Sequence, residues 1–212
     1  MIIGKFVIVA IMAYLLGAIP FAFIVSKKMA GIDISKHGSG NIGGTNVYRV
    51  LGRKVGAIAM GLDLAKAFTA VMAARYIIGD SVFVVVGIPI TWQWGQALAA
   101  ITVMVGHNWS IYIKFRGGKG VATYFGSWFA MWPAAALVAG VILLLTLLRS
   151  RLMSLGSLLA AAGVLVLFII LTVAYGFPII YLVYSVIAAG LICYQHRANI
   201  NRLMRGTELR LK

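Results

Sequence analysis

The stretch that decides the fold is YFGSWFAMWPAAALVAGVILLLTLL, residues 124–148, which contains no charged residue. A helix of about 20 apolar residues crosses the hydrocarbon core of a bilayer, so this stretch is long enough for one crossing. However, proline stands at position 133, and proline cannot continue the hydrogen-bond ladder of a helix. The stretch therefore forms either one interrupted crossing or a hairpin of two short helices that turns near Trp132-Pro133.

Similar apolar runs lie on both sides of this stretch, at 2–25, 55–78, 82–113, 154–175 and 177–195. Of the 212 residues, 62% are hydrophobic and 11% are charged, and the mean hydropathy is +1.00. Soluble domains carry about 25% charged residues, so this composition excludes an ordinary soluble protein. The first run is too long for the apolar core of a signal peptide. The sequence predicts an all-α, polytopic membrane protein with a single domain over 1–212.

Polar segments rich in Lys and Arg separate the runs, at 26–54, 114–123, 149–151 and 196–212. The positive-inside rule places such segments in the cytoplasm. All of them lie inside only if the N-terminus is outside and 124–148 turns back as a hairpin. We therefore predict about seven transmembrane elements, two of them short, with the C-terminus in the cytoplasm.

The net charge of +15 comes from 19 Lys and Arg against 4 Asp and Glu. Such a balance suits an anionic partner, and the hydropathy favours membrane lipid or an anionic substrate over nucleic acid. The single cysteine, Cys193, excludes an intramolecular disulfide. The four carboxylates are scattered along the chain, so we expect no metal cluster.

The stretch HGSGNIGGTN, residues 37–46, spells G-x-G-x-x-G, and Asp63 lies 20 residues beyond Gly43. This is the fingerprint of a dinucleotide-binding turn, but that turn needs a strand and a parallel sheet around it. Apolar helices flank it here. We therefore predict a loop whose backbone N–H groups hold a phosphate, with Thr45 or Asn46 capping a helix that starts near Val47.

Two further segments carry residues suited to binding anions. FRGGKG, residues 115–120, places a lysine among glycines but lacks the spacing of a nucleotide P-loop. HRANINRLMRGTE, residues 196–208, places His196, Asn199 and Arg202 on one side of a helix. Together with the first loop they indicate one site for phosphorylated molecules at one face of the membrane.

Charged residues inside the apolar runs are functional candidates by default. Asp63 and Lys66 stand at i and i+3 in one run, where an ion pair that braces the helices is the alternative explanation. His107, near the end of another run, is either a brace between helices or a catalytic group.

These three segments, in this order, resemble the bacterial acyl-phosphate:glycerol-3-phosphate acyltransferases over essentially the whole chain. The resemblance rests on GSGNIGGTN with Arg49, on GH at 106–107 with FRGGKGVAT, and on H-x-x-N-x-x-R with GTE at 206–208. Two small departures exist, because Gly44 stands where alanine is common and no proline follows His107. Neither departure removes a polar group.

The resemblance implies that an acyl phosphate gives its fatty acyl group to the first hydroxyl of glycerol 3-phosphate. The expected products are 1-acylglycerol 3-phosphate (lysophosphatidic acid) and phosphate, in the first step of phospholipid synthesis. It implies no cofactor, no metal, and neither acyl-CoA nor acyl carrier protein as donor. The expected partners are the two substrates and membrane lipid, for a monomer in the bacterial inner membrane whose active site lies at the cytoplasmic face.

The motifs and the resemblance together assign the site residues. Catalytic roles are expected for Ser39, Lys119, His196 and Asn199, and these four with Arg49 are expected to hold glycerol 3-phosphate. Contacts with acyl phosphate are expected from Gly40, Asn41, Gly43, Thr45, Asn46, Gly118 and Gly120. Supporting roles are expected for Asp63, Lys66, His107, Thr123, Arg202 and Glu208.

Two questions stay open at this point. The base that accepts the hydroxyl proton is either His196 or the phosphate of the donor. The alternative function is a transporter or channel for a phosphorylated anion, since intramembrane charge and basic mouths suit that class as well. The sequence shows no internal repeat, and the polar segments lie at one face, which favours the enzyme.

Overall fold

The computed structural model describes residues 2–80 and 82–211. The elements in chain order are α1 (Ile2–Ala18), α2 (Phe21–Ala30), η1 (Ile34–Lys36), α3 (Gly44–Ile78), β1 (Phe83–Val85), β2 (Ile88–Ile90), α4 (Trp92–Asn108), η2 (Ile111–Ile113), α5 (Val121–Met131), α6 (Pro133–Ser150), α7 (Met153–Tyr175), α8 (Ile179–Gln195) and α9 (Arg197–Met204).

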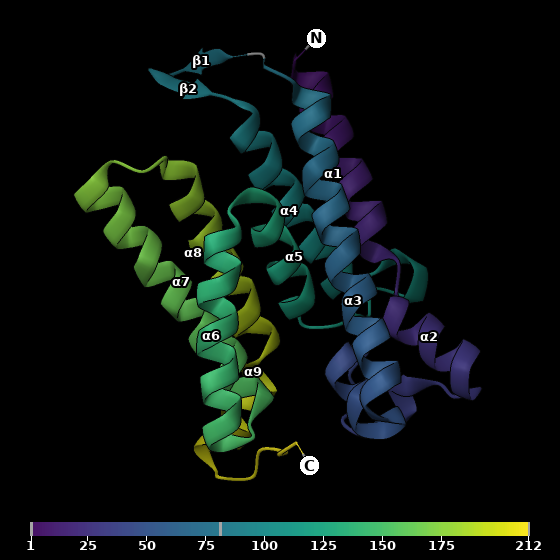
Figure 1. Cartoon of the computed structure of the whole chain (residues 1–212). Helices are drawn as coiled ribbons and strands as arrows, with labels where there is room; N and C mark the ends of the chain where they lie inside the picture. Colours follow the sequence, from purple (N-terminus) through teal and green to yellow (C-terminus); the bar gives the residue numbers. More distant parts are fainter. Residues whose placement is uncertain (1, 81, 212) are drawn as a thin grey trace.

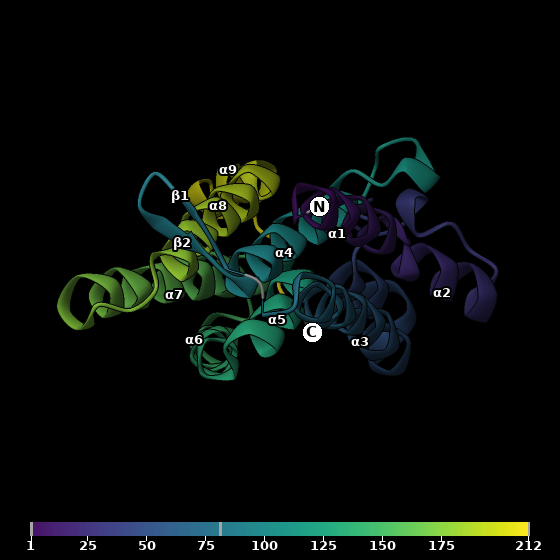
Figure 2. The same cartoon turned by 90° about the horizontal axis from the view of Figure 1, so that it is seen from above.

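The helices form a bundle in which α4 and α5 occupy the middle (Figures 1 and 2). Helix α1 packs on α3 and α4, α5 packs on α3, α4 and α6, and α7 packs on α6 and α8. Helices α2 and α9 and the C-terminus lie toward one end, and the N-terminus and the β1–β2 hairpin lie at the opposite end (Figure 1). The three predicted anion-binding segments therefore lie at the same end of the bundle.

Small residues bring the central helices close together. A Cβ on Gly17 of α1 would collide with the backbone of Val103, and one on Gly106 of α4 would collide with the carbonyl of Tyr14. Gly126 of α5 approaches the backbone of α3 in the same way. Close backbone approach through small residues is the usual means of packing helices in membranes, where lipid offers no hydrophobic drive for association.

The predicted membrane class fits the helices of the described residues. The helical stretches Ile2–Ala30, Gly44–Ile78, Pro133–Ser150 and Met153–Tyr175 are long and apolar enough to cross a bilayer. A fifth crossing is formed if α8 and α9, which bend by 65° at His196, count as one. Seven transmembrane elements and the placement of the termini stay predictions.

The expected break in 124–148 is confirmed, because α5 ends at Met131 and α6 begins at Pro133. Trp132 has extended backbone angles and joins two helices that lie side by side (Figure 1). The expectation of two short helices is wrong for α6. It has 18 residues against 11 for α5, because the apolar run continues without a breaker as far as Ser150.

The apolar run 82–113 was expected to be a single helix, which is wrong for its first part. Residues Phe83–Val85 and Ile88–Ile90 pair as antiparallel strands. Val86 and Gly87 both have positive φ, 48° and 78°, as a tight type I′ turn requires. The valines of this segment are β-branched and favour a strand, so local propensity, which hydropathy ignores, decides the structure here.

Helix α3 is a hairpin at its basic end. Gly52 has φ 85° and ψ 178°, which no helix contains, and the chain reverses there. A Cβ on Gly44 would collide with Met60, and a Cβ on Gly56 would lie 2.6 Å from Cα of Tyr48. The arm 44–51 therefore packs back on the arm that follows Gly52, and this packing brings Arg49 toward the middle of the bundle.

Candidate active site

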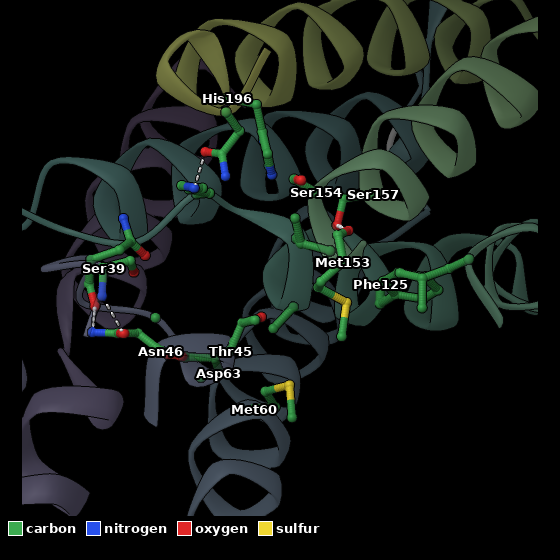
Figure 3. A pocket seen from close by; sticks show the side chains of 18 of the residues that line it. Ser39, Thr45, Asn46, Met60, Asp63, Phe125, Met153, Ser154, Ser157 and His196 are labelled. Carbon is green, nitrogen blue, oxygen red and sulfur yellow. Dashed lines mark hydrogen bonds between the residues drawn. The ribbon is translucent and has the colours of Figure 1, made fainter. Parts of the chain in front are cut away.

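A cavity of about 360 Å³ opens at the basic end, between α3, α5, α6, α7 and α9. Its polar lining comes from all three predicted segments, and Figure 3 shows part of it. The predicted residues that line it are Ser39, Asn41, Gly43, Thr45, Asn46, Arg49, Asp63, His107, Lys119, His196, Asn199 and Glu208. Every residue to which we assigned a catalytic or glycerol 3-phosphate-binding role is among them.

A hydrogen-bonded chain crosses one side of the cavity. The Nζ of Lys119 donates to Oδ1 of Asn199, and Nδ2 of Asn199 donates to Oε1 of Glu208 at 2.7 Å. Glu208 also accepts from Nε of Arg202 at 2.8 Å and from Oγ of Ser154 at 3.0 Å. The carboxylate thus compensates the charge of Arg202 and fixes the amide of Asn199, which in turn orients the Lys119 ammonium.

Burial lowers the pKa of Lys119 to about 8, from 10.5. The carboxylate of Glu208 opposes this shift, while the cations of Arg202 and Arg49 add to it. Below pH 8 the side chain is a partly desolvated cation, and such a cation attracts phosphate more strongly than one in water. Lys119 is therefore suited to bind an anion reversibly.

His196 stands at the bend between α8 and α9. Its Nδ1 donates to the carbonyl of Ile192 at 2.8 Å, which leaves Nε2 as an acceptor. Burial, and then the ammonium of Lys119, lower the pKa of His196 to about 4. Figure 3 shows the ring reaching into the cavity from the side opposite Ser39 and Asn46. At neutral pH the cavity therefore contains an uncharged imidazole.

Arg49 connects α3 to the C-terminal segment. Its Nη2 donates to the carbonyl of Leu209 at 2.9 Å, and its buried Nε has no hydrogen-bond partner among the residues that the structure describes. The amide of Leu211 donates to the carbonyl of Arg151 at 2.8 Å. Residues 207–211 thus pass from α9 across to α3 and the α6–α7 turn, and Arg49 keeps an unused donor at the cavity.

The side chain of Asn46 forms hydrogen bonds within the first glycine loop. Its Oδ1 accepts from the amide of Ser39 at 2.9 Å, and its Nδ2 lies within 3.2 Å of the carbonyls of His37, Asn41 and Ile34. The side chain is buried and its hydrogen bonds are used inside the loop. Asn46 therefore stabilises the shape of the loop, and its contact with acyl phosphate stays a prediction.

The expected capping of the helix by Thr45 or Asn46 is wrong. Helix α3 begins at Gly44 and not near Val47, and Gly43 occupies the N-cap without a side-chain bond. The N–H groups of Gly44 and Thr45 fall in the first turn, where no acceptor exists within the helix. This turn lines the cavity, so its N–H groups and helix dipole favour an anion there.

Six predicted residues lie outside the cavity lining. Gly40 is exposed, Gly118 packs on His107, and Gly120 is the N-cap of α5, with φ 81°. Thr123 donates from Oγ1 to the carbonyl of Gly120 at 2.9 Å, and so stabilises this helix start. The remaining two, Lys66 and Arg202, form ion pairs with Asp63 and Glu208, which do line the cavity.

The predicted ion pair between Asp63 and Lys66 is present, with Nζ 2.7 Å from Oδ1. Nζ of Lys66 also donates to the carbonyl of Ile19 at 2.7 Å and lies 3.1 Å from Nδ1 of His107. The three side chains are buried, and they connect α3 to α4 and to the break between α1 and α2. In the described residues no group of three His, Cys, Asp or Glu is arranged to hold a metal.

Sequence reasoning missed the apolar wall of the cavity, formed by Met60, Gly61, Leu64, Phe125, Gly140, Leu143 and Met153. It also missed Ser154 and the carbonyl of Leu209. Apolar residues that face a groove look the same in the sequence as those that face lipid, so no signal could have found them. The wall continues directly from the polar lining, so the cavity has one charged arm and one apolar arm.

Comparisons with known proteins agree on one family. The family model described as glycerol-3-phosphate acyltransferase matches residues 7–206. A glycerol-3-phosphate acyltransferase 3 of Dehalococcoides mccartyi is 41% identical over all of this chain and 98% of its own length. A glycerol-3-phosphate acyltransferase of Halalkalibacterium halodurans is 40% identical over 94% of this chain and 92% of its own.

Solved structures agree with the sequence comparisons. The crystal structure of PlsY (YgiH), an integral membrane glycerol 3-phosphate acyltransferase, in its glycerol 3-phosphate form is 36% identical, with a TM-score of 0.84. That match covers 98% of this chain and 96% of the other. The lysophosphatidic acid form of PlsY matches with a TM-score of 0.82 over 98% and 95% of the two chains. The resemblance noted in the motifs is confirmed: this chain belongs to the glycerol-3-phosphate acyltransferase family of integral membrane proteins.

Proposed function

We propose that the protein transfers a fatty acyl group from acyl phosphate to the first hydroxyl of glycerol 3-phosphate. The products are 1-acylglycerol 3-phosphate and inorganic phosphate. The observation that carries this proposal is a cavity in which a cationic arm continues into an apolar arm. One arm suits a small dianion, and the other suits a hydrocarbon chain.

Glycerol 3-phosphate binds in the cationic arm. Lys119 and the unused Nε of Arg49 supply positive charge and donors for its phosphate. Ser39 and Asn199 bind its hydroxyls, and Nε2 of His196 accepts a hydrogen bond from the hydroxyl that reacts. The acceptor is a soluble metabolite, and the cationic arm opens among the basic segments, which supports a site at the cytoplasmic face.

Acyl phosphate places its chain in the apolar arm and its phosphate against the first turn of α3. Each buried CH₂ contributes about 0.8 kcal/mol to binding. The N–H groups near Gly43 and Thr45, together with Asn41, hold the phosphate. A mixed anhydride already contains a good leaving group, so acyl-CoA, acyl carrier protein and a metal are all unnecessary for the transfer.

The reaction proceeds by attack of the first hydroxyl oxygen on the acyl carbonyl carbon. Lys119 or a backbone N–H stabilises the tetrahedral oxyanion. Collapse of this intermediate breaks the bond between the carbonyl carbon and the phosphate oxygen, and the new ester forms.

The hydroxyl proton passes to the departing phosphate. The second pKa of a phosphate monoester is about 6, so such a phosphate is a stronger base than an imidazole whose pKa is about 4. His196 therefore orients the hydroxyl and does not remove its proton. Of the two candidate bases, we propose the phosphate of the donor.

The test is phosphate release by purified protein in a bilayer, with palmitoyl phosphate in the presence and absence of glycerol 3-phosphate. Release that needs both substrates, with an equal amount of lysophosphatidic acid, is the expected result. Lys119→Ala and Asn199→Ala should each lower the rate at least about tenfold, the loss of roughly one charge-assisted hydrogen bond. Folded protein that gives product with acyl-CoA but not with acyl phosphate would refute the donor, and no product with either would refute the transfer.

His196→Gln tests the choice of base. Glutamine places an amide near the position of Nε2 and can still orient a hydroxyl, but it cannot accept a proton. Turnover within about tenfold of the wild type is expected if the donor phosphate is the base. A loss of about a thousandfold with unchanged substrate binding, the range of general-base catalysis, would identify His196 as the base.

A further inference from the structure

The buried cluster of Asp63, Lys66 and His107 does not take part in the chemistry described above. Its members are between 1% and 7% exposed; Asp63 and His107 belong to the cavity lining, whereas Lys66 lies behind it. An ion pair alone would satisfy Asp63 and Lys66, so the imidazole of His107 needs a separate explanation. Two of its contacts supply one.

The first contact fixes the imidazole from behind. Nζ of Lys66 lies 3.1 Å from Nδ1 of His107, and an ammonium can only donate. Nδ1 also lies 3.4 Å from Oδ1 of Asp63, so both members of the ion pair contact the imidazole from the same side. Lys66 is in turn held by Asp63 and by the carbonyl of Ile19, both at 2.7 Å, so the direction of the ring is fixed.

The second contact lies on the opposite side of the ring. Nε2 occupies the place where a Cβ on Gly118 would stand, so that only glycine fits against the imidazole. The amide of Gly118 also donates to the carbonyl of His107 at 3.1 Å. A Cβ on Gly117 would lie 2.6 Å from the carbonyl oxygen of Asn108, so the next glycine is equally close to the end of α4. The loop 117–118 therefore rests on the imidazole and on the end of α4.

The contact between His107 and Gly118 lies one residue before Lys119, which lines the cavity. Lys119 follows Gly118 directly, and its ammonium donates to Asn199 in the cavity. The first glycine loop is also in contact, because a Cβ on Gly43 would lie 3.9 Å from Cα of Gly118. A shift of Gly118 would thus move the donors of both loops.

We propose that His107 is a positioning residue: Lys66 holds its imidazole against Gly118, and this contact sets the place of Lys119 in the cavity. The kinetic tests of this inference rest on the proposed function, whereas the structural test does not. Its expected signature is a raised KM for glycerol 3-phosphate with a smaller change in kcat, because Lys119 binds the acceptor phosphate before the transition state is reached.

The first experiment compares His107→Gln with His107→Asn. Glutamine extends an amide to the place of Nε2, beneath Gly118, whereas asparagine keeps an acceptor near Nδ1 for Lys66 and leaves the space beneath Gly118 empty. If the imidazole positions the loop, KM should rise at least about tenfold for Asn and clearly less for Gln. A His107→Asn variant with the wild-type KM would overturn the proposal. Thr102→Val, which changes the same helix through its own intrahelical bond, is the control.

The second experiment tests the contact itself with Gly118→Ala, His107→Ala and the double variant. The added methyl group collides with the ring in the first variant and enters the vacated space in the double variant. Residues in contact are not additive, so the double variant should be no worse than Gly118→Ala alone. Losses that multiply would show that the two positions act independently and would contradict the proposal.

A third measurement needs no substrate and separates this inference from the proposed function. Amide hydrogen exchange of residues 114–120 is followed in bilayers for the wild type, His107→Asn and Thr102→Val. Faster exchange of this segment only in His107→Asn supports the positioning role even if the transfer reaction fails its own test. Equal exchange in all three proteins would overturn the positioning role.

Discussion

Lys119 shows how much a single residue depends on its surroundings. Its sequence context, a lysine between glycines, predicted an anion site, and the structure places the residue in the cavity lining; the context gave no electrostatic detail. The structure adds Asn199, Glu208 and the burial that lowers the pKa to about 8. These partners come from the far end of the chain, so no local pattern could indicate them.

The first prediction follows from that pKa. Because the pKa is lowered from 10.5 to about 8, Lys119 is charged below pH 8 and loses its charge as the pH rises through 8. About nine lysines in ten are charged at pH 7 and about one in ten at pH 9, so kcat/KM for glycerol 3-phosphate should fall about tenfold between pH 7 and pH 9. Arginine stays protonated in this range, so Lys119→Arg should remove this alkaline limb even if its maximal rate is lower. A profile of the wild type that stays flat to pH 10 would contradict the assignment.

At the scale of elements, Gly52 decides where Ser39 and Arg49 stand, because the arm 44–51 folds back at this residue. The sequence predicted a helix start near this loop but not the reversal, since glycine inside an apolar, helix-like pattern is ambiguous. The β1–β2 hairpin was missed for a related reason, because hydropathy alone does not distinguish valine-rich strands from membrane helices. Periodic and apolar patterns predict that a helix or strand is present. The direction that the chain then takes depends on the backbone angles of single residues, which these patterns do not show.

The second prediction concerns this reversal. Gly52→Ala places a Cβ on a residue with φ 85° and ψ 178°, a region that is essentially restricted to glycine and costs other residues about 1–3 kcal/mol. We expect a lower midpoint of thermal unfolding and a lower affinity for glycerol 3-phosphate. Gly61→Ala is the matched control, because it lies in the same helix without positive φ and its Cβ would meet nothing within 4 Å. Equal effects of the two substitutions would speak against the hairpin.

The third prediction concerns the apolar arm between α3 and α6. A side chain at Gly61 enters open space beside Met60 and Leu64, so Gly61→Trp should fill the groove without disturbing the fold. The rate with palmitoyl phosphate should fall at least about tenfold, since the chain loses burial of several CH₂ groups, whereas the rate with acetyl phosphate should be retained. Gly4→Trp is the control, because Gly4 also faces open space but lies near the N-terminus, in the first turn of α1 and outside the cavity lining. An equal loss with both donors would place the acyl chain elsewhere.

At the scale of the whole molecule, the basic segments meet at one end of the bundle and the β1–β2 hairpin lies at the other (Figure 1). Charge distribution and a proline at position 133 were enough to predict a reversal within 124–148 and the gathering of three distant segments at one site. The size of the site, its apolar arm and the C-terminal segment that completes it depend on tertiary packing. These features could not be derived from spacing.

The fourth prediction tests the orientation of the molecule. In a Cys193→Ser background, a cysteine at Val86 in the hairpin should react with an impermeant thiol reagent in intact cells. A cysteine at Lys54, beside the turn of α3, should react only after the membrane is opened. Both positions are exposed, so access depends on the side of the membrane and not on burial. The reverse pattern would invert the proposed topology.

The apolar arm reaches the surface of the bundle at Gly61, which is exposed, while the cationic arm opens among the basic segments. In the proposed reaction the two substrates therefore arrive from different phases, one from water and one from within the bilayer. For the lipid substrate the relevant concentration is its mole fraction in the membrane, so adding inert lipid should slow the enzyme although nothing in the aqueous solution has changed. The same geometry separates the products, because phosphate leaves into water and the new lipid stays in the bilayer.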